Sequence, residues 1–135
     1  MLRTQVALAN EHIHPIRMRE AIVAGHDPAW AAESLAGDLR TAAVDVVDGL
    51  PVLDLVVLGV GGDGHVLSVF PGSPALDAPT DRWALAIDAP SHIEPHVERV
   101  TMHPGVIAVA RGVLVVATGA GKADVLAAVF GPTRD

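Results

Sequence analysis

The feature that most constrains this chain is a short apolar run that leads into a cluster of glycines. Residues 55–58 read Leu-Val-Val-Leu, with no polar residue among them. Such a run predicts a strand buried on both faces, as in a parallel sheet. Gly59, Gly61, Gly62 and Gly64 follow it directly. Because glycines let the backbone come close to a ligand, and ligands in open α/β sheets bind beyond the carboxyl ends of strands, a binding loop is expected here.

Asp63 and His65 are the side chains of this loop that can take part in proton transfer. An imidazole is suited to general-base catalysis near neutral pH, and an adjacent carboxylate can orient it or stabilise its protonated form. The alternative interpretation is a histidine that only faces solvent. The carboxylate and the glycines at a strand end favour an active site.

A nucleotide-binding loop is a further alternative, since Gly59, Gly61 and Gly64 match the spacing G-x-G-x-x-G. That fingerprint requires a long helix whose N-terminus holds the pyrophosphate. Here Pro71 would end any helix within two turns, and Asp63 would place negative charge beside the phosphates. The sequence therefore argues against a dinucleotide site.

The remaining pattern predicts alternating helices and strands, and so an α/β fold. Asp27 and Pro28 are typical of the start of a helix, whose apolar stripe runs to Val46 before Gly49. Trp30 is expected to be a packing residue on this stripe. Further expected elements are a helix tail over residues 1–10, an edge strand around 13–16, strands over 83–87, 99–102 and 113–117, and helices over 104–110 and 123–130.

Composition narrows the function. The chain has 135 residues, which fits a single domain, and a net charge of −7, which argues against nucleic-acid binding. It has no cysteine and therefore no disulfide or thiolate chemistry. A signal peptide or membrane span is not expected, so a cytoplasmic protein is the default. The His92, Glu94 and His96 cluster does not have zinc spacing, and no metal is predicted; His12 and His14 are expected to be exposed.

A second strand, residues 113–117, also leads into a glycine-rich turn and a helix. Lys122 is expected in the first helical turn, where backbone N–H groups and the helix dipole favour an anion. The Walker spacing is not met, and a solvated lysine is the alternative interpretation.

The whole string over residues 59–72 resembles the signature of the 6-phosphogluconolactonases, Gly-x-Gly-x-Asp-Gly-His-x-Ala-Ser-Leu-Phe-Pro. The chain departs from it at Leu67 and Val69, each an apolar residue in place of another. Residues 68–71 favour the lactonases over the related glucosamine-6-phosphate deaminases, which usually continue toward Asn-Glu-Pro. Weaker similarity covers residues 10–130, including Gly-x-x-Lys-Ala at residues 119–123 and the arginine–threonine pair described next.

The resemblance implies a Rossmann-like, open and mostly parallel sheet flanked by helices, forming one partial domain over residues 1–135. It implies hydrolysis of 6-phospho-D-glucono-1,5-lactone, with His65 as general base on water, Asp63 as its partner and glycine N–H groups at the oxyanion. Lys122 and Arg99, the latter two residues before Thr101, are expected to bind the substrate's charged groups. No metal or cofactor is implied; the expected partner is a small-molecule sugar-phosphate lactone, with no nucleic acid or membrane, and the oligomeric state stays open.

Two elements of the family are not found in the sequence, a Ser-Gly-Gly-Ser-type phosphate loop and an Asp-Glu-Arg segment. The chain is therefore expected to be a fragment or a shortened homologue that contains the general base but lacks most of the residues that bind the phosphate. Two alternatives stay open. One is deamination and isomerisation of glucosamine 6-phosphate; the other is a non-catalytic effector domain that binds a sugar phosphate.

Overall fold

The computed structural model describes residues 8–131. Its helices and strands, in order, are η1 (Asn10–His12), α2 (Met18–Ala24), α3 (Pro28–Thr41), β1 (Val46–Val47), β2 (Leu50–Pro51), β3 (Val56–Gly59), η2 (Pro74–Asp77), β4 (Ala84–Ile87), β5 (Arg99–Met102), α4 (Val106–Val109), β6 (Val113–Val116), η3 (Ala120–Lys122) and α5 (Ala123–Phe130). The helix tail expected over residues 1–10 lies mostly outside this range.

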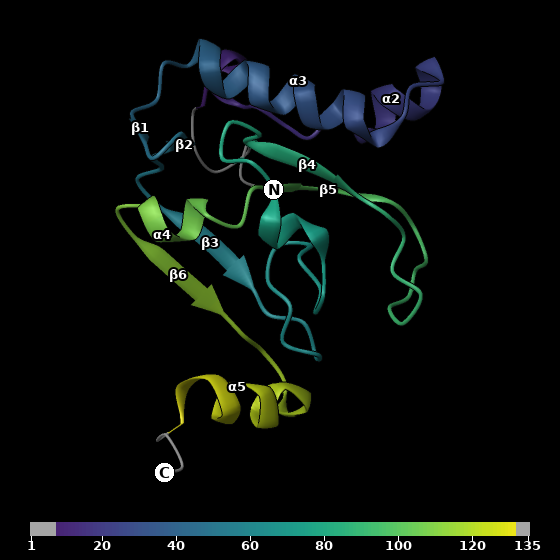
Figure 1. Cartoon of the computed structure of the whole chain (residues 1–135), viewed down its shortest axis with the longest axis vertical. Helices are drawn as coiled ribbons and strands as arrows, with labels where there is room; N and C mark the ends of the chain where they lie inside the picture. The colour runs from purple at the N-terminus through teal and green to yellow at the C-terminus, as the bar shows by residue number, and fades with distance from the viewer. Residues whose placement is uncertain (1–7, 132–135) are drawn as a thin grey trace.

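The two apolar strands of the sequence pair with each other. β3 and β6 are parallel, in a register that runs from Val56 opposite Val113 to Gly59 opposite Val116 (Figure 1). The carboxyl ends of both strands therefore meet at one edge, where both glycine-rich turns begin. The other pairs, β1 with β2 and β4 with β5, are antiparallel. The described residues thus form a mixed α/β fold with two-stranded sheets, and the expectation of a mostly parallel sheet is wrong for them.

Strand β3 is buried on one face only, which corrects the prediction of a strand buried on both. Val56 and Leu58 are 8% and 4% exposed, whereas Leu55 and Val57 are 57% and 60% exposed. The apolar run alone could not show this alternation, because Leu and Val stand at the exposed and the buried positions alike. All four residues of β6 are also exposed.

The main core lies between α3 and the β4–β5 pair, which pack against each other (Figure 1). It is built from small side chains of α3, Trp83, and one face of each strand, as follows: Ala31, Ala32, Leu35, Ala36, Trp83, Ala84 and Val100, with Ala21 of α2. Trp30 is 38% exposed and lies outside this core, and its packing contact is a stack on the ring of His26. Small residues on the buried stripe let the helix lie close to the strands.

Helix α3 begins as predicted, because the Asp27 carboxylate accepts a hydrogen bond from the Trp30 N–H at 3.0 Å. It ends earlier than predicted, at Thr41. Ala43 has a left-handed backbone with φ of 52°, which an α-helix does not allow, and Val46 belongs to β1. The β-branched residues after position 43 favour extended backbone, and this outweighs the helical spacing.

The segment after β3 covers the other face of the β4–β5 pair. Val69 and Ala75 pack there against Leu85. The Ser68 N–H donates to Oγ1 of Thr101, which is 4% exposed, at 3.2 Å. The glycine loop and the strand pair are thereby fixed to each other, and this positions the candidate site.

The strands at 84–87, 99–102 and 113–116 and the helix at 123–130 are confirmed, and the helix expected over 104–110 is shorter. No strand forms over residues 13–16 in the described structure, and His12 and His14 are exposed, as expected. Among the described residues, no helix has both the length and the apolar character needed to cross a membrane.

Candidate active site

The loop after β3 closes on itself through backbone hydrogen bonds. The Gly61 N–H donates to the His65 carbonyl at 2.8 Å, and the Gly64 N–H donates to the Gly61 carbonyl at 3.2 Å. Gly64 has a φ of 91°, which a residue with a side chain rarely adopts. No helix begins between this loop and η2, so the helix N-terminus required for a dinucleotide is not formed there.

The turn brings the two titratable side chains into direct contact. Nδ1 of His65 lies 2.5 Å from Oδ1 of Asp63, and the His65 backbone N–H donates to the same oxygen at 3.3 Å. A carboxylate only accepts, so the neutral imidazole donates from Nδ1 and keeps its lone pair on Nε2. The side chains are 18% and 23% exposed. Nε2 of His65 is thus the atom suited to take a proton.

The ionised form of Asp63 is favoured by this contact. Partial burial acts to raise the pKa of Asp63, but the hydrogen bonds from the ring and backbone of His65, together with its charge, outweigh burial and lower the pKa below 3.8. Asp63 therefore remains a carboxylate at neutral pH and can stabilise a protonated His65.

Gly61 makes room for the pair. A Cβ atom on Gly61 would lie 2.2 Å from Nδ1 of His65 and 2.6 Å from Oδ1 of Asp63. Gly59 and Gly62, in contrast, have open space where a Cβ would stand. The N–H groups of Gly62 and Asp63 donate to no carbonyl of the described backbone, so a ligand oxygen can use them, and Gly62 also has open space beside it.

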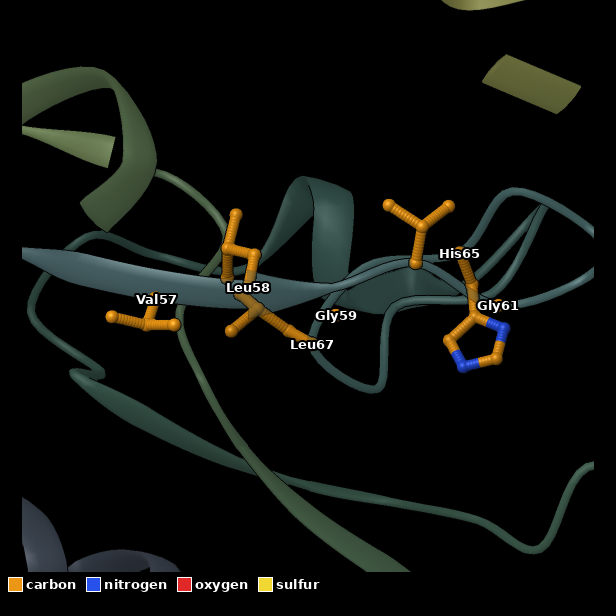
Figure 2. Close-up of a pocket in the computed structure, with 7 residues that line it drawn as sticks. Val57, Leu58, Gly59, Gly61, His65 and Leu67 are labelled. Atoms are coloured by element: carbon orange, nitrogen blue, oxygen red, sulfur yellow. The ribbon is translucent and has the colours of Figure 1, made fainter. Parts of the chain in front are cut away.

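The imidazole sits between an aromatic ring and a hollow. The Phe70 ring, from a residue 5% exposed, lies 4.4 Å from the His65 ring, centroid to centroid, tilted by 48°. Figure 2 shows His65 beside Gly61 at the end of β3, with Val57 and Leu58 farther back along the strand. These residues, with Gly59, Val60 and Leu67, line an open hollow of about 320 Å³. That volume is at the lower end of small-ligand sites.

Leu67 is a site feature that the sequence did not reveal. Its φ of 56° places a branched residue in the left-handed region. The neighbouring Val66 forms isolated antiparallel β-bridges with Val60 and with Val69. Such strain costs about 1–3 kcal/mol and persists only where the surroundings enforce it. Here it turns the Leu67 side chain into the lining of the hollow.

Lys122 reaches the loop, although not in the way predicted. It is the last residue of η3 and the N-cap of α5, not a member of the first turn of α5. Its ammonium group donates to the Val60 carbonyl. A Cβ on Gly64 would lie 2.8 Å from Cγ2 of Val125 in α5, so the two glycine-rich segments are close neighbours. Lys122 therefore places positive charge beside the site while part of its donor capacity is used by the backbone.

Arg99 approaches the site from the start of β5. Its guanidinium carbon lies 5.7 Å from the centre of the Phe70 ring, and Nη2 donates to the Pro95 carbonyl at 3.3 Å. Nε of Arg99 is buried and has no hydrogen-bond partner among the described residues. Thr101, which follows on the same strand, accepts a hydrogen bond from the Ser68 N–H and is 4% exposed, so it is a structural contact beside the site.

His92 is the residue whose place the sequence did not predict. Its Nε2 lies 3.5 Å from Oδ2 of Asp63, and its ring meets Phe70 edge-on at 5.6 Å. His96, from the same segment, pairs with Glu94 at 3.3 Å instead. Within residues 8–131, no three side chains of the metal-binding types gather closely enough to hold an ion. The sequence signal that pointed to His92 was the clustering of histidines at positions 92–96, and this clustering does not show that Asp63 is the residue that His92 contacts.

Comparison with known proteins places this chain in a family. The family profile described as "Glucosamine-6-phosphate isomerases/6-phosphogluconolactonase" matches residues 1–135. The chain is 46% identical over 96 residues to 6-phosphogluconolactonase from Rattus norvegicus, covering 71% of this chain and 35% of the relative. It is 35% identical over 121 residues to a probable 6-phosphogluconolactonase from Oryza sativa subsp. japonica, covering 89% and 40%.

Solved structures agree with the sequence comparison. The 6-phosphogluconolactonase from Trypanosoma cruzi superposes with a TM-score of 0.66 at 33% identity, over 78% of this chain and 40% of that one. The Trypanosoma brucei enzyme gives a TM-score of 0.66 at 30% identity, over 83% and 48%. The chain thus spans between about a third and a half of the length of these relatives. It belongs to the glucosamine-6-phosphate isomerase/6-phosphogluconolactonase family.

Proposed function

We propose that the chain carries the proton-transfer centre of a 6-phosphogluconolactonase, in which His65 acts as general base on water. The observation that carries the proposal is the contact between Asp63 and His65, packed over Gly61 at the carboxyl end of β3. The relatives bearing the lactonase name support the choice of substrate.

The reaction follows from the orientation of the ring. Nε2 of His65 takes a proton from water, and the oxygen of that water bonds to the lactone carbonyl carbon. The carbonyl oxygen becomes an oxyanion, for which the Gly62 N–H is a candidate donor. When the tetrahedral intermediate collapses, the ring C–O bond breaks, and the imidazolium returns the proton to the leaving oxygen. The product is a hydroxy acid, and Asp63 offsets the positive charge on His65 in between.

Lys122 and Arg99 are proposed to bind the phosphate or the developing carboxylate. Both lie beside the site, and Arg99 has an unused Nε donor among the described contacts. Because each of them spends a donor on a backbone carbonyl, we expect them to contribute less to substrate binding than a fully free pair of cations would.

Hydrolysis of freshly prepared 6-phosphogluconolactone, followed by acid release above the spontaneous rate, tests the proposal. The wild-type chain should accelerate hydrolysis, and His65→Gln should lose about 10²–10⁴-fold in kcat, the usual contribution of a placed base. His12→Gln is the matched control, because His12 is exposed on η1, outside the site.

Three results would contradict the proposal. One is a wild-type chain without activity above the spontaneous rate. Another is a His65→Gln variant that keeps the wild-type rate. The third is release of ammonia from glucosamine 6-phosphate in place of acid from the lactone, which would favour the deaminase activity.

A further inference from the structure

The carboxylate of Asp63 lies between two imidazoles. Its Oδ1 is 2.5 Å from Nδ1 of His65, and its Oδ2 is 3.5 Å from Nε2 of His92. The two histidines come from different parts of the chain: His65 from the loop after β3, His92 from the connection between β4 and β5. The first contact is a short hydrogen bond, whereas the second is a longer and weaker polar contact.

Phe70 joins the two rings. His65 lies over its ring at 4.4 Å, and His92 meets the ring edge-on at 5.6 Å with the planes 87° apart. Edge-to-face contact at this distance is a preferred arrangement of aromatic rings. Since Phe70 is 5% exposed, His92 is placed by an apolar contact as well as by the charge of Asp63.

The segment that carries His92 is itself tied to β5. Nη2 of Arg99 donates to the Pro95 carbonyl at 3.3 Å, and the Val97 N–H donates to the same oxygen at 2.9 Å. Arg99 also lies over Phe70. The arginine therefore holds the His92 segment against the aromatic ring on which His65 rests.

We propose that His92 is a positioning residue of this site, which holds Oδ2 of Asp63 and thereby keeps Oδ1 directed at Nδ1 of His65. This proposal rests on the proposed function and names a further residue of the same centre. A carboxylate with a partner on one oxygen only can turn about its Cβ–Cγ bond. A polar contact on the second oxygen opposes that rotation and leaves less of the carboxylate open to water.

The expected effect is small, because His92 is 52% exposed and its contact is long. Exposed pairs of this kind are worth about 0.2–1 kcal/mol, or roughly a 1.5- to 5-fold change in an equilibrium. His96 is the matched control. It lies on the same segment at 51% exposure, but its partner is Glu94.

The test measures, in the 135-residue chain at neutral pH, how fast the Nδ1-bound proton of His65 exchanges with water, by NMR of the ¹⁵N-labelled imidazole. His92→Phe keeps a ring against Phe70 but has no donor, and should speed exchange by about 1.5- to 5-fold. His92→Gln keeps an N–H donor and should restore the slow exchange. His96→Phe should match the wild type. Asp63→Asn, which removes the anion, sets the upper limit of the change.

This measurement needs no turnover, so it is separate from the test of the lactonase activity. If His92→Phe exchanges like the wild type and like His96→Phe, the positioning role is wrong. It is also wrong if His92→Gln and His92→Phe change the rate equally, because the effect would then come from packing. Kinetics on active protein add a second readout: His92→Phe should lower kcat by the same factor as the Nδ1 contact weakens, with KM unchanged.

Discussion

Gly61→Ala tests whether the positions of His65 and Asp63 matter, because it disturbs their geometry without removing either side chain. It changes neither a charge nor a donor, yet its Cβ would stand 2.2 Å from Nδ1 and 2.3 Å from Cε1 of His65, and 2.6 Å from Oδ1 of Asp63. Ordinary contact of a Cβ begins near 3.4 Å, so the ring has to move by about an ångström. The backbone of Gly61 is not in the left-handed region, so alanine brings no backbone strain of its own.

A displacement of about 1 Å at a catalytic group costs roughly 10²-fold in rate. We therefore expect Gly61→Ala to lose about that factor in kcat for the lactone while the chain stays folded. Gly62→Ala is the matched control one position along. A Cβ there meets nothing within 4 Å, and the backbone of Gly62 is not left-handed. Alanine also keeps the backbone N–H that is proposed for the oxyanion, so activity should stay near the wild-type value.

Lactone hydrolysis measures the activity of both variants, and circular dichroism shows whether they are folded. Equal activities of Gly61→Ala and Gly62→Ala, in folded proteins, would refute the reasoning that His65 works in the position seen here. A loss of activity in both would show that the loop tolerates no side chain at all and that the specific contact with His65 has no special role.

Three further predictions concern stability. The Asp63–His65 contact should add its full contribution to the free energy of unfolding above pH 3.8, the ordinary carboxyl pKa, and lose it as the pH falls through the lowered pKa of Asp63 in the folded state, because between these two values the unfolded chain binds more protons. Urea unfolding from pH 3 to 7 should therefore show a free energy that falls toward low pH in the wild type, and a smaller fall in Asp63→Asn. Leu58→Ala, at 4% exposure, should cost about 2–5 kcal/mol, whereas Val57→Ala, at 60% exposure, should cost no more than about 0.5 kcal/mol; equal losses would contradict the one-sided burial of β3. Thr101→Val should cost about 1–3 kcal/mol by leaving the Ser68 N–H without its acceptor, and thermal unfolding that matches the wild type would exclude that bond.

The local signals of the sequence were sufficient for much of the fold. Asp27 caps α3 as predicted, and the apolar runs at positions 56–59 and 113–116 form parallel strands. The sequence did not give the face of β3 that is buried, since Leu55 and Leu58 differ in exposure but not in chemistry. Nor did it give the end of α3, where helical spacing continued but the backbone at Ala43 did not.

In the candidate site too, local contacts could be predicted from the sequence, whereas contacts between distant segments could not. The contact between Asp63 and His65 is local, and the spacing of two residues on a glycine turn was enough to predict it. The contact of His92 with Asp63 depends on how the β4–β5 connection returns over Phe70, which is a property of the tertiary structure. The bond from Lys122 to the Val60 carbonyl is of the same kind, so its direction could not be read from residues 119–123.

The most direct test of the account is the tautomer of His65 in the 135-residue chain, read from the ¹⁵N chemical shifts of its ring at a pH where the imidazole is neutral. The contact with Asp63 predicts a proton on Nδ1 and a bare Nε2, on a ring that lines the hollow where water and the lactone carbonyl would meet. A proton found on Nε2 instead would leave the lone pair on Nδ1, against Asp63, and Nε2 could not accept a proton from water. The proposed general base would then be wrong.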